Sequence, residues 1–183
     1  MRVAISPIGG EIEKETHSLI VGEKMSVVYT GGTFDLLHWG HIRFLYSCKK
    51  LAGKDGLLIV GLNNDQFVES FKKVDVHHSY KERERNLSMI GIVDYIVENV
   101  GNASFKPTYE KFFSTYSNLF PKPDIMAIST DWATKDYYKQ MGITQDWLDG
   151  HNIVLVYIPH TIGISSTILR KVKEMEDDNI RDT

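Results

Sequence analysis

The sequence predicts an α/β protein with a Rossmann-like, doubly wound parallel sheet of about five strands and helices on both faces. Apolar runs rich in β-branched residues recur along the chain, at 26–30, 56–62, 93–100, 124–129 and 153–159. Continuous apolar runs of this length are typical of strands that are buried on both faces. Stretches with helical spacing separate the runs, and this alternation favours a parallel sheet whose ligands bind at the carboxyl ends of the strands.

The expected helices and domain boundaries follow from the same pattern. Helical spacing is found at 40–53, 79–91, 108–120, 134–142 and 165–178. With 183 residues, of which 42% are hydrophobic, the chain can form one substantial core but is short for two full domains. We expect one domain over 25–175, an N-terminal extension over 1–24 and a flexible acidic tail over 176–183.

Composition and charge exclude several classes of function. The formal net charge is -3 and no block of Lys and Arg is present, which argues against binding to nucleic acid or to a membrane surface. The single cysteine, Cys48, excludes an intramolecular disulfide and a cysteine-based zinc site, and we expect it to be a buried thiol. Residues 1–15 match neither a signal peptide nor a membrane span. We therefore expect a cytoplasmic protein that binds small molecules.

The segment GGTFDLLHWGHIRFL, residues 31–45, carries two histidines where the first predicted strand gives way to a helix. His38 and His41 are three positions apart and lie on one face of the first helical turn. Gly40 between them adds no side chain to that face. A helix N-terminus attracts anions through its unpaired N–H groups and its dipole. Two imidazoles at this position suit the binding of phosphate and of charge that develops on phosphate in a transition state.

Two other interpretations of these histidines stay open on the residues alone. A pair at this spacing is often part of a solvated helix face, or one core and one surface residue. Zinc is the other alternative, but only Asp35 and Asp131 offer a third ligand, and no HExxH motif or cysteine partner accompanies them.

A second motif of phosphate-binding type, GISSTILRK at 163–171, follows the last predicted strand. Ser165, Ser166 and Thr167 supply hydroxyl groups and N–H donors at the start of the last helix, and Arg170 comes about one turn later. Alone, this pattern is that of an ordinary capped helix. As the second of two helix N-termini at the ends of one sheet, it can face the first across a crevice and help to hold a triphosphate.

The two motifs resemble those of the HxGH nucleotidyltransferases, in particular the cytidylyltransferases that act on glycerol 3-phosphate. The matching segments are GTFDLLHWGH and GISSTILRK. They are supported by HHSYKERER at 77–85, which is similar to the family's His-Ser-Tyr-x-x-Arg stretch. STDW at 129–132 takes the place of the family's Gly-Asp-Asp-Trp. The resemblance covers about residues 26–172, with local expansions around 101–120 and 133–150.

The resemblance implies an enzyme that transfers CMP from CTP to a small phosphorylated alcohol, most simply glycerol 3-phosphate. In such an enzyme the acceptor phosphate attacks the α-phosphorus in line, so catalysis consists mostly of positioning and charge stabilisation. The resemblance also implies a homodimer, and we expect Mg²⁺ as cofactor from the chemistry of the reaction. The ion would be held mainly by phosphate oxygens, with Asp35 as the candidate protein ligand.

Carried over residue by residue, the resemblance implies catalytic roles for His38, His41, Arg83 and Lys72, or Lys73 in place of Lys72. Without it, Arg83 belongs to a solvated helix face and the lysines to a polar loop. The residues that the resemblance assigns to nucleotide binding are Gly32, Thr33, Phe34, Asp35, Gly40, Asp131, His160, Thr161, Ile164, Ser165, Ser166 and Thr167.

One departure from the family pattern leaves the substrates open. The family reads Arg-Thr-x-Gly-Ile-Ser-Thr-Thr where this chain has HTIGISST, so His160 replaces an arginine and its permanent charge and planar fork of donors. An adenylyltransferase that uses ATP with a sugar phosphate or a cofactor precursor is therefore an alternative. From another class, a nucleotide-binding sensor without catalysis is a third hypothesis, which the intact pair of histidines disfavours.

Overall fold

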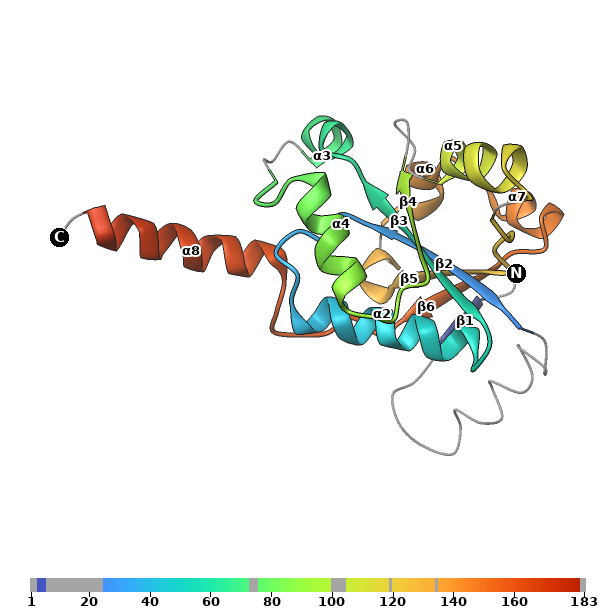
Figure 1. The fold of residues 1–183 in the computed structure, drawn as a ribbon, viewed down its shortest axis with the longest axis horizontal. Helices are drawn as coiled ribbons and strands as arrows, with labels where there is room; N and C mark the ends of the chain where they lie inside the picture. The colour runs from blue at the N-terminus through green and yellow to red at the C-terminus, as the bar shows by residue number, and fades with distance from the viewer. Residues whose placement is uncertain are drawn as a thin grey trace.

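The strands of the protein form one parallel sheet. The computed structural model describes residues 3–5, 25–72, 76–99, 105–118, 120–133 and 135–181. The sheet has six strands in the order β1-β6-β5-β2-β3-β4, and every neighbouring pair is parallel (Figure 1). The strands are β1 (Val3–Ile5), β2 (Val27–Gly32), β3 (Leu57–Asn63), β4 (Tyr95–Asn99), β5 (Ile125–Ser129) and β6 (Val154–Ile158).

The five predicted strands are confirmed, and β1 adds a sixth that the sequence did not predict. It lies inside the predicted N-terminal extension and pairs with β6, with Ala4 opposite Val156. Three residues are too few to give a periodic signal in the sequence. Apart from β1, the prediction for residues 1–24 lies outside the described residues.

The order of the strands reverses between β2 and β5. From β2 the chain continues outward to β3 and β4, whereas β5 and β6 lie on the other side of β2. In doubly wound sheets, the crevice at the carboxyl ends of the two strands beside such a reversal is the usual place for a ligand. The carboxyl ends of β2 and β5 are Gly32 and Ser129.

Helices connect the strands, and five of them correspond to the predicted helical stretches. The structure adds α3 and α7, which have eight and six residues and are too short to show clear helical periodicity. The helices are α2 (Trp39–Ala52), α3 (Asp65–Lys72), α4 (Tyr80–Met89), α5 (Lys106–Thr108) with the π-helix η1 (Tyr109–Thr115), the 3₁₀-helix η2 (Thr130–Trp132), α6 (Tyr137–Met141), α7 (Gln145–Gly150) and α8 (Ser166–Arg181).

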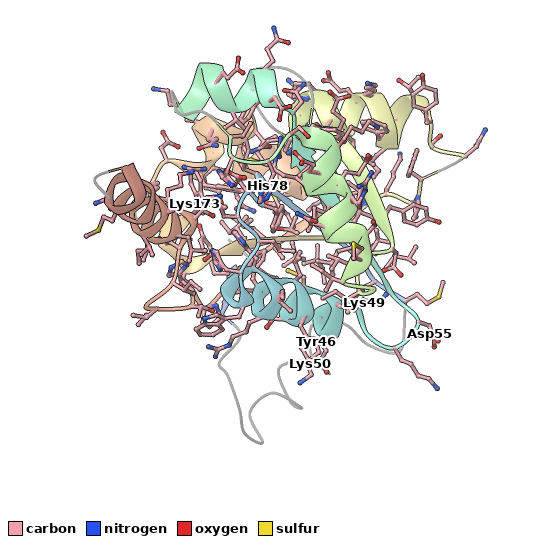
Figure 2. All side chains as sticks on the ribbon, turned by 60° about the vertical axis from the view of Figure 1, so that its left-hand side comes forward. Tyr46, Lys49, Lys50, Asp55, His78 and Lys173 are labelled. Carbon is pink, nitrogen blue, oxygen red and sulfur yellow. The ribbon has the colours of Figure 1, made fainter. Side chains whose placement is uncertain are left out.

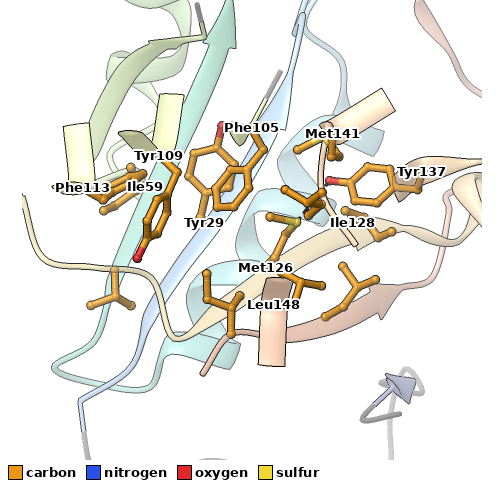
Figure 3. Close-up of a cluster of buried hydrophobic side chains, with 14 of the residues drawn as sticks. Tyr29, Ile59, Phe105, Tyr109, Phe113, Met126, Ile128, Tyr137, Met141 and Leu148 are labelled. Carbon is orange, nitrogen blue, oxygen red and sulfur yellow. Dashed lines mark hydrogen bonds between the residues drawn. The ribbon is translucent and has the colours of Figure 1, made fainter. Parts of the chain in front are cut away.

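Helices cover both faces of the sheet, as the doubly wound prediction requires. Successive residues of β3 point to opposite faces: Leu58 packs with Cys48 of α2 and Leu87 of α4, while Ile59 belongs to a cluster on the other face. Cys48 is a buried free thiol, as predicted. The second cluster is rich in aromatic side chains from Phe105 before α5 and from η1, α6 and α7, and Tyr29 packs at its centre (Figure 3).

Helix α8 extends beyond the domain boundary predicted at 175. It begins at Ser166, continues through Arg181 and extends away from the sheet (Figure 1). The flexibility predicted for residues 176–183 stays a prediction. The run 166–181 contains no glycine or proline and is rich in Glu, Lys, Arg and Met, which are good helix formers, so the helix has no reason to end at 175.

Candidate active site

A pocket of about 570 Å³ opens at the carboxyl ends of β2 and β5, where the strand order reverses. Both motifs contribute to its walls, together with the residues that follow β5 and β6. It brings together both predicted histidines and every residue predicted to bind the nucleotide, namely Gly32, Thr33, Phe34, Asp35, His38, Gly40, His41, Asp131, His160, Thr161, Ile164, Ser165, Ser166 and Thr167.

The rings of His38 and His41 stack in this pocket, with 3.8 Å between their centroids and 21° between their planes. His38 is the N-cap of α2, and its Nδ1 accepts a hydrogen bond from the backbone N–H of His41 at 3.4 Å. Because Nδ1 is the acceptor, the proton of the neutral ring is on Nε2. Burial lowers the pKa of His38, and the nearby charge of His160 lowers it further. His38 is thus a neutral side chain that can donate a hydrogen bond from Nε2.

The loop between β2 and α2 holds non-glycine residues in left-handed conformations. Phe34 has φ of 50° and Leu36 has φ of 47°. Such conformations are costly for residues with a side chain and tend to cluster at functional sites. The ring of Phe34 meets that of His41 edge to face at 5.3 Å between centroids. The strained loop therefore sets the position of the second histidine.

Gly40 lies where the two motifs meet. A Cβ atom at this position would be 3.0 Å from Nδ1 of His38 and 3.1 Å from Cγ2 of Ile164. These distances are shorter than ordinary van der Waals contacts, so a side chain at position 40 would push the motifs apart. The absence of a side chain lets the N-terminal ends of α2 and α8 approach each other on one side of the pocket.

Asp35 joins three segments beside the pocket. Its carboxylate is almost completely buried and accepts from the backbone N–H groups of Leu36, His77 and His78 at 2.9–3.0 Å, and from Nη2 of Arg170 at 2.7 Å. Burial alone would raise the pKa of Asp35, but these hydrogen bonds and the charge of Arg170 outweigh it and lower the pKa to about 2. Both oxygens are used by protein donors. In this arrangement the contacts of Asp35 are those of a structural residue, and its role as a ligand of Mg²⁺ stays a prediction.

Arg83, which was predicted to be catalytic, lies outside the pocket lining in this structure. Its side chain is completely buried and is not among the residues that line the pocket. It donates to the carbonyl oxygens of Thr33 (2.7 Å), Asn63 (2.8 Å) and His78 (3.0 Å), and it forms an ion pair with Asp65. With these partners it cannot contact a substrate phosphate in this arrangement. It holds the loop after β2 against the end of β3 instead.

The lysines predicted for catalysis are not placed. Lys72 is the last residue of α3, and its side chain lies outside the described residues. Lys73 lies outside them altogether. Their assignment remains a prediction.

His160, which replaces the family arginine, lies on the pocket wall formed by β5 and β6. Its Nδ1 is 3.3 Å from Oγ of Ser129 and 3.8 Å from the carboxylate of Asp131, and its backbone N–H donates to Oγ1 of Thr130 at 2.9 Å. Lys135 lies on the same wall, 3.6 Å from Asp131. The wall thus carries both signs of charge.

A buried network of hydrogen bonds that the sequence analysis did not find leads from the core to the pocket. Tyr29 donates to Asn99 (2.6 Å), Asn99 donates to Asn63 (2.7 Å), and Asn63 donates to Oγ1 of Thr33 (3.1 Å). All four residues are buried. A signal was available, because Asn63 directly follows the apolar run 56–62 and Asn99 lies next to the end of the run 93–100, at the edge of the sheet where the site was expected.

The described residues do not form a protein cage for a metal ion. Within them, no group of three His, Cys, Asp or Glu side chains is placed to hold one. Asp131, whose side chain is exposed, is the remaining carboxylate of the pocket. Nor is any helix in the described part of the chain long and apolar enough to cross a membrane.

Comparison with known proteins identifies the family. Residues 29–172 match the model of the cytidylyltransferase-like family. The chain belongs to this family of nucleotidyltransferases. A glycerol-3-phosphate cytidylyltransferase from Bacillus spizizenii is 33% identical over 150 residues, which cover 80% of this chain and 96% of the relative.

Relatives with other substrates are similar to nearly the same degree. An FAD synthase from Korarchaeum cryptofilum is 33% identical over 147 residues, which cover 79% of this chain and 90% of that protein. The bifunctional protein HldE from Campylobacter concisus is 30% identical over 164 residues, which cover 85% of this chain and 29% of that protein. Sequence similarity therefore leaves the nucleotide and the acceptor open.

Solved structures share the fold. A lipopolysaccharide core biosynthesis protein from Thermoplasma volcanium superimposes with a TM-score of 0.52 at 22% identity, covering 75% of this chain and 98% of that protein. This likeness supports the Rossmann-like architecture and nothing more specific.

Proposed function

We propose that the protein transfers CMP from CTP to a small phosphorylated alcohol, most simply glycerol 3-phosphate, and releases pyrophosphate. The observation that carries the proposal is the meeting of the two motifs at one pocket, where the stacked histidines of α2 face the start of α8. The choice of substrates is supported by the similarity to glycerol-3-phosphate cytidylyltransferases over nearly their whole length.

The proposed reaction is an in-line displacement at the α-phosphorus. An oxygen of the acceptor phosphate forms a new bond to this phosphorus, and the bond from the phosphorus to the bridging oxygen of the β-phosphate breaks. Pyrophosphate leaves with the electron pair of the broken bond. His38 donates from Nε2 to the phosphate oxygens that gain charge, with His41 beside it, and preorganised donors of this kind stabilise a transition state without reorganisation.

The start of α8 binds the β- and γ-phosphates in this proposal. Ser165 caps the helix by accepting from the N–H of Ile168 at 3.2 Å, which leaves the remaining N–H groups of the first turn for an anion. Mg²⁺ would neutralise phosphate charge in this reaction, and Asp131 is the pocket carboxylate that can supply a protein ligand.

A second candidate is transfer of AMP from ATP to another acceptor. Two observations favour it: the FAD synthase relative is as similar as the glycerol-3-phosphate cytidylyltransferases, and His160 replaces the family arginine. The mechanism would be the same in both candidates. The ligand that binds against the pocket wall with His160 would be different.

Pyrophosphate release with Mg²⁺ tests both candidates. CTP, ATP, UTP and GTP are each combined with glycerol 3-phosphate, with other phosphorylated alcohols and sugars, and with no acceptor. The proposal expects release with CTP and glycerol 3-phosphate together, with a CDP-alcohol as the second product by mass spectrometry. Release with ATP alone among the nucleotides would replace it by the second candidate, and no release with any pair would contradict both.

The homodimer that the resemblance implies is also a proposal. Sedimentation at several concentrations tests it, since a dimer has twice the 20.9 kDa mass of one chain. A single-chain mass at all concentrations would contradict it.

A further inference from the structure

A buried amide, that of Asn99, uses its full hydrogen-bonding capacity between the core and the pocket. Its Oδ1 atom accepts from the hydroxyl groups of Tyr29 at 2.6 Å and Thr108 at 3.1 Å. Its Nδ2 atom donates to the backbone oxygen of Gly61 at 3.0 Å and to Oδ1 of Asn63 at 2.7 Å. An asparagine side chain has two donor hydrogens and two acceptor positions, so Asn99 has none to spare.

The backbone oxygen of Gly61 fixes which way this amide is turned. A carbonyl oxygen can only accept, so the atom of Asn99 that faces it must be Nδ2. The same nitrogen also donates to Asn63, which therefore presents Oδ1 to Asn99 and Nδ2 to its other neighbour. That neighbour is Thr33, whose Oγ1 lies 3.1 Å from Nδ2 of Asn63. The directions of the hydrogen bonds from Asn99 to Thr33 thus follow from one backbone group.

The sequence leaves room for these groups where β3 passes them. A Cβ atom at Gly61 would collide with the hydroxyl of Tyr29 and with Oδ1 of Asn99. Burial also raises the pKa of Tyr29, so its hydroxyl keeps the proton that it donates. Tyr29 is thus a permanent donor to Asn99 at neutral pH.

The hydroxyl of Thr33 has a hydrogen that the protein does not use. Because Oγ1 accepts from Asn63, this hydrogen must point elsewhere. Among the described residues, no hydrogen bond from the hydroxyl to a protein acceptor is found. Thr33 and Asn63 line the pocket, whereas Asn99 and Tyr29 do not. The hydrogen is therefore available to an acceptor atom of a ligand in the pocket.

Arg83 holds the backbone of both pocket residues. It donates to the backbone oxygens of Thr33 at 2.7 Å and Asn63 at 2.8 Å. A third hydrogen bond, at 3.0 Å, joins it to the backbone oxygen of His78, which faces Lys173 of α8 across a shallow groove (Figure 2). The backbone positions of Thr33 and Asn63 are thus set without a ligand, and side-chain hydrogen bonding decides whether the Thr33 hydroxyl can donate to one.

We propose that Asn63 is a positioning residue that makes the Thr33 hydroxyl a hydrogen-bond donor to an oxygen atom of the bound nucleotide, and that Asn99 and Tyr29 hold Asn63 in this role. The inference rests on the proposed nucleotidyl transfer but not on the choice of base or acceptor. It goes beyond the predicted contact of Thr33 with the nucleotide, because it assigns the direction of that contact to side chains of β2, β3 and β4.

Asn63→Asp tests the direction of the contact with little change in shape. One carboxylate oxygen still accepts from Asn99, while the other replaces Nδ2 and takes the hydrogen of the Thr33 hydroxyl, so the nucleotide loses its donor. Calorimetry with CTP and with ATP measures the affinity of the full chain, and thermal unfolding confirms that each variant folds. We expect Asn63→Asp and Thr33→Val each to weaken nucleotide binding at least about tenfold, the usual effect of losing a hydrogen bond to a charged group.

The double variant separates this effect from that of the added charge. Adding Asn63→Asp to Thr33→Val should cause little further loss of affinity, because both changes act through one hydroxyl group. Thr33→Ser keeps the hydroxyl and should recover most of the affinity that Thr33→Val loses. Thr108→Val is the matched control: it removes another hydrogen bond of Asn99, outside the pocket, and should cost stability without weakening nucleotide binding.

Three results would overturn the inference. They are unchanged nucleotide affinity in Asn63→Asp, an equal loss of affinity in Thr108→Val, and a double variant in which Asn63→Asp costs as much affinity as it does alone. A wild-type protein that shows the expected pattern with CTP or ATP but releases no pyrophosphate with any acceptor would refute the proposed function alone. Absence of CTP and ATP binding to the wild type would overturn both.

Discussion

At the scale of single residues, removal of His41 distinguishes a role in catalysis from a role in nucleotide binding. Its ring stacks on His38 and meets Phe34 edge to face, so it is fixed before any ligand arrives. If it stabilises charge that develops during transfer, its removal must slow turnover more than it weakens nucleotide binding. A sensor without catalysis would show no such difference.

We expect His41→Ala to lower kcat about 100-fold or more, which is the usual cost of losing one transition-state donor, while the nucleotide Kd changes only a few-fold. Pyrophosphate release measures the first effect and calorimetry the second. Tyr46→Ala, an exposed change on the same helix and outside the pocket, is the control and should alter neither. Small and equal effects on both quantities would favour the sensor.

His38 gives a prediction about pH. Burial and the charge of His160 lower its pKa, so the ring takes up its second proton only below the usual histidine range. Uptake at Nδ1 would remove one of the two acceptors of the His41 N–H group, which also donates to the backbone oxygen of His38 at 2.9 Å. Activity should therefore decrease at lower pH than it would if His38 had the usual pKa of a histidine.

Substitution of His160 tests the cause of this shift. His160→Ala removes one source of positive charge and should raise the pKa of His38, moving the acid limb of kcat/KM to higher pH. His160→Arg makes the charge permanent and should move it to lower pH. Titration of the His38 ring by NMR measures the shift directly. Ser129→Ala removes a contact of His160 without changing its charge, and it should leave the limb where it is.

At the scale of elements, the close approach of α2 and α8 depends on Gly40. Alanine at this position, in the first turn of α2, would gain helix propensity of about 1 kcal/mol over glycine. Its Cβ atom would nevertheless press on His38 and Ile164 at 3.0 and 3.1 Å. Stability and activity should therefore respond differently to Gly40→Ala.

We expect Gly40→Ala to leave the free energy of unfolding within about 1 kcal/mol of the wild type, and to lower kcat/KM at least about tenfold, as displacement of catalytic groups does. Denaturant unfolding and pyrophosphate release measure the two effects. Ser47→Ala, a substitution later in α2, controls for general changes of the helix. Full activity in Gly40→Ala would show that the spacing of the two motifs is not critical.

The elements also show which features the sequence can predict. The five main strands are long apolar runs, and burial on both faces makes such runs visible in the sequence. Helix α7 gives a weaker signal in the sequence. Thr144 caps it by accepting from the N–H of Trp147 at 3.1 Å, so its start can be found, but the helix itself is short. The three residues of β1 depend on the edge of β6 for their conformation, and nothing local specifies them.

The position of the site could be predicted from the sequence, but the roles of its charged residues could be predicted less well. The rule that ligands bind at the carboxyl ends of strands placed His38 and Ser165 correctly in one pocket. Sequence alone could not show that Arg83 turns inward, because its acceptors belong to β3 and to the loop after β2, which are distant in sequence. The same holds for Arg170, whose partner is 135 positions away.

At the scale of the whole molecule, the buried polar groups join the core to the pocket. The chain of hydrogen bonds from Tyr29 to Thr33 crosses β4, β3 and the loop after β2, and Arg83 binds the same loop from α4. A fully satisfied buried network gives a structure one well-defined arrangement. A substitution outside the pocket that shifts the equilibrium toward the unfolded chain should therefore reduce the fraction of molecules in which the pocket is formed.

Arg83→Met tests this connection. It removes four hydrogen bonds at once and leaves the carbonyl oxygens of Thr33, Asn63 and His78 without this donor, so the free energy of unfolding should fall by about 3 kcal/mol or more. Denaturant unfolding measures the loss. Arg85→Met, an exposed change two positions along α4, should cost less than about 0.5 kcal/mol.

The same variant decides between a structural and a catalytic Arg83. In a structural role, the fraction of Arg83→Met that remains folded should bind pyrophosphate with nearly the wild-type affinity, because Arg83 does not line the pocket. Direct contact with a substrate phosphate predicts the reverse, a large loss of pyrophosphate affinity at modest cost in stability. Calorimetry at low temperature, where most of the variant is folded, distinguishes the structural role from the catalytic role. A large loss of pyrophosphate affinity would mean that Arg83 leaves its buried partners when the substrate binds.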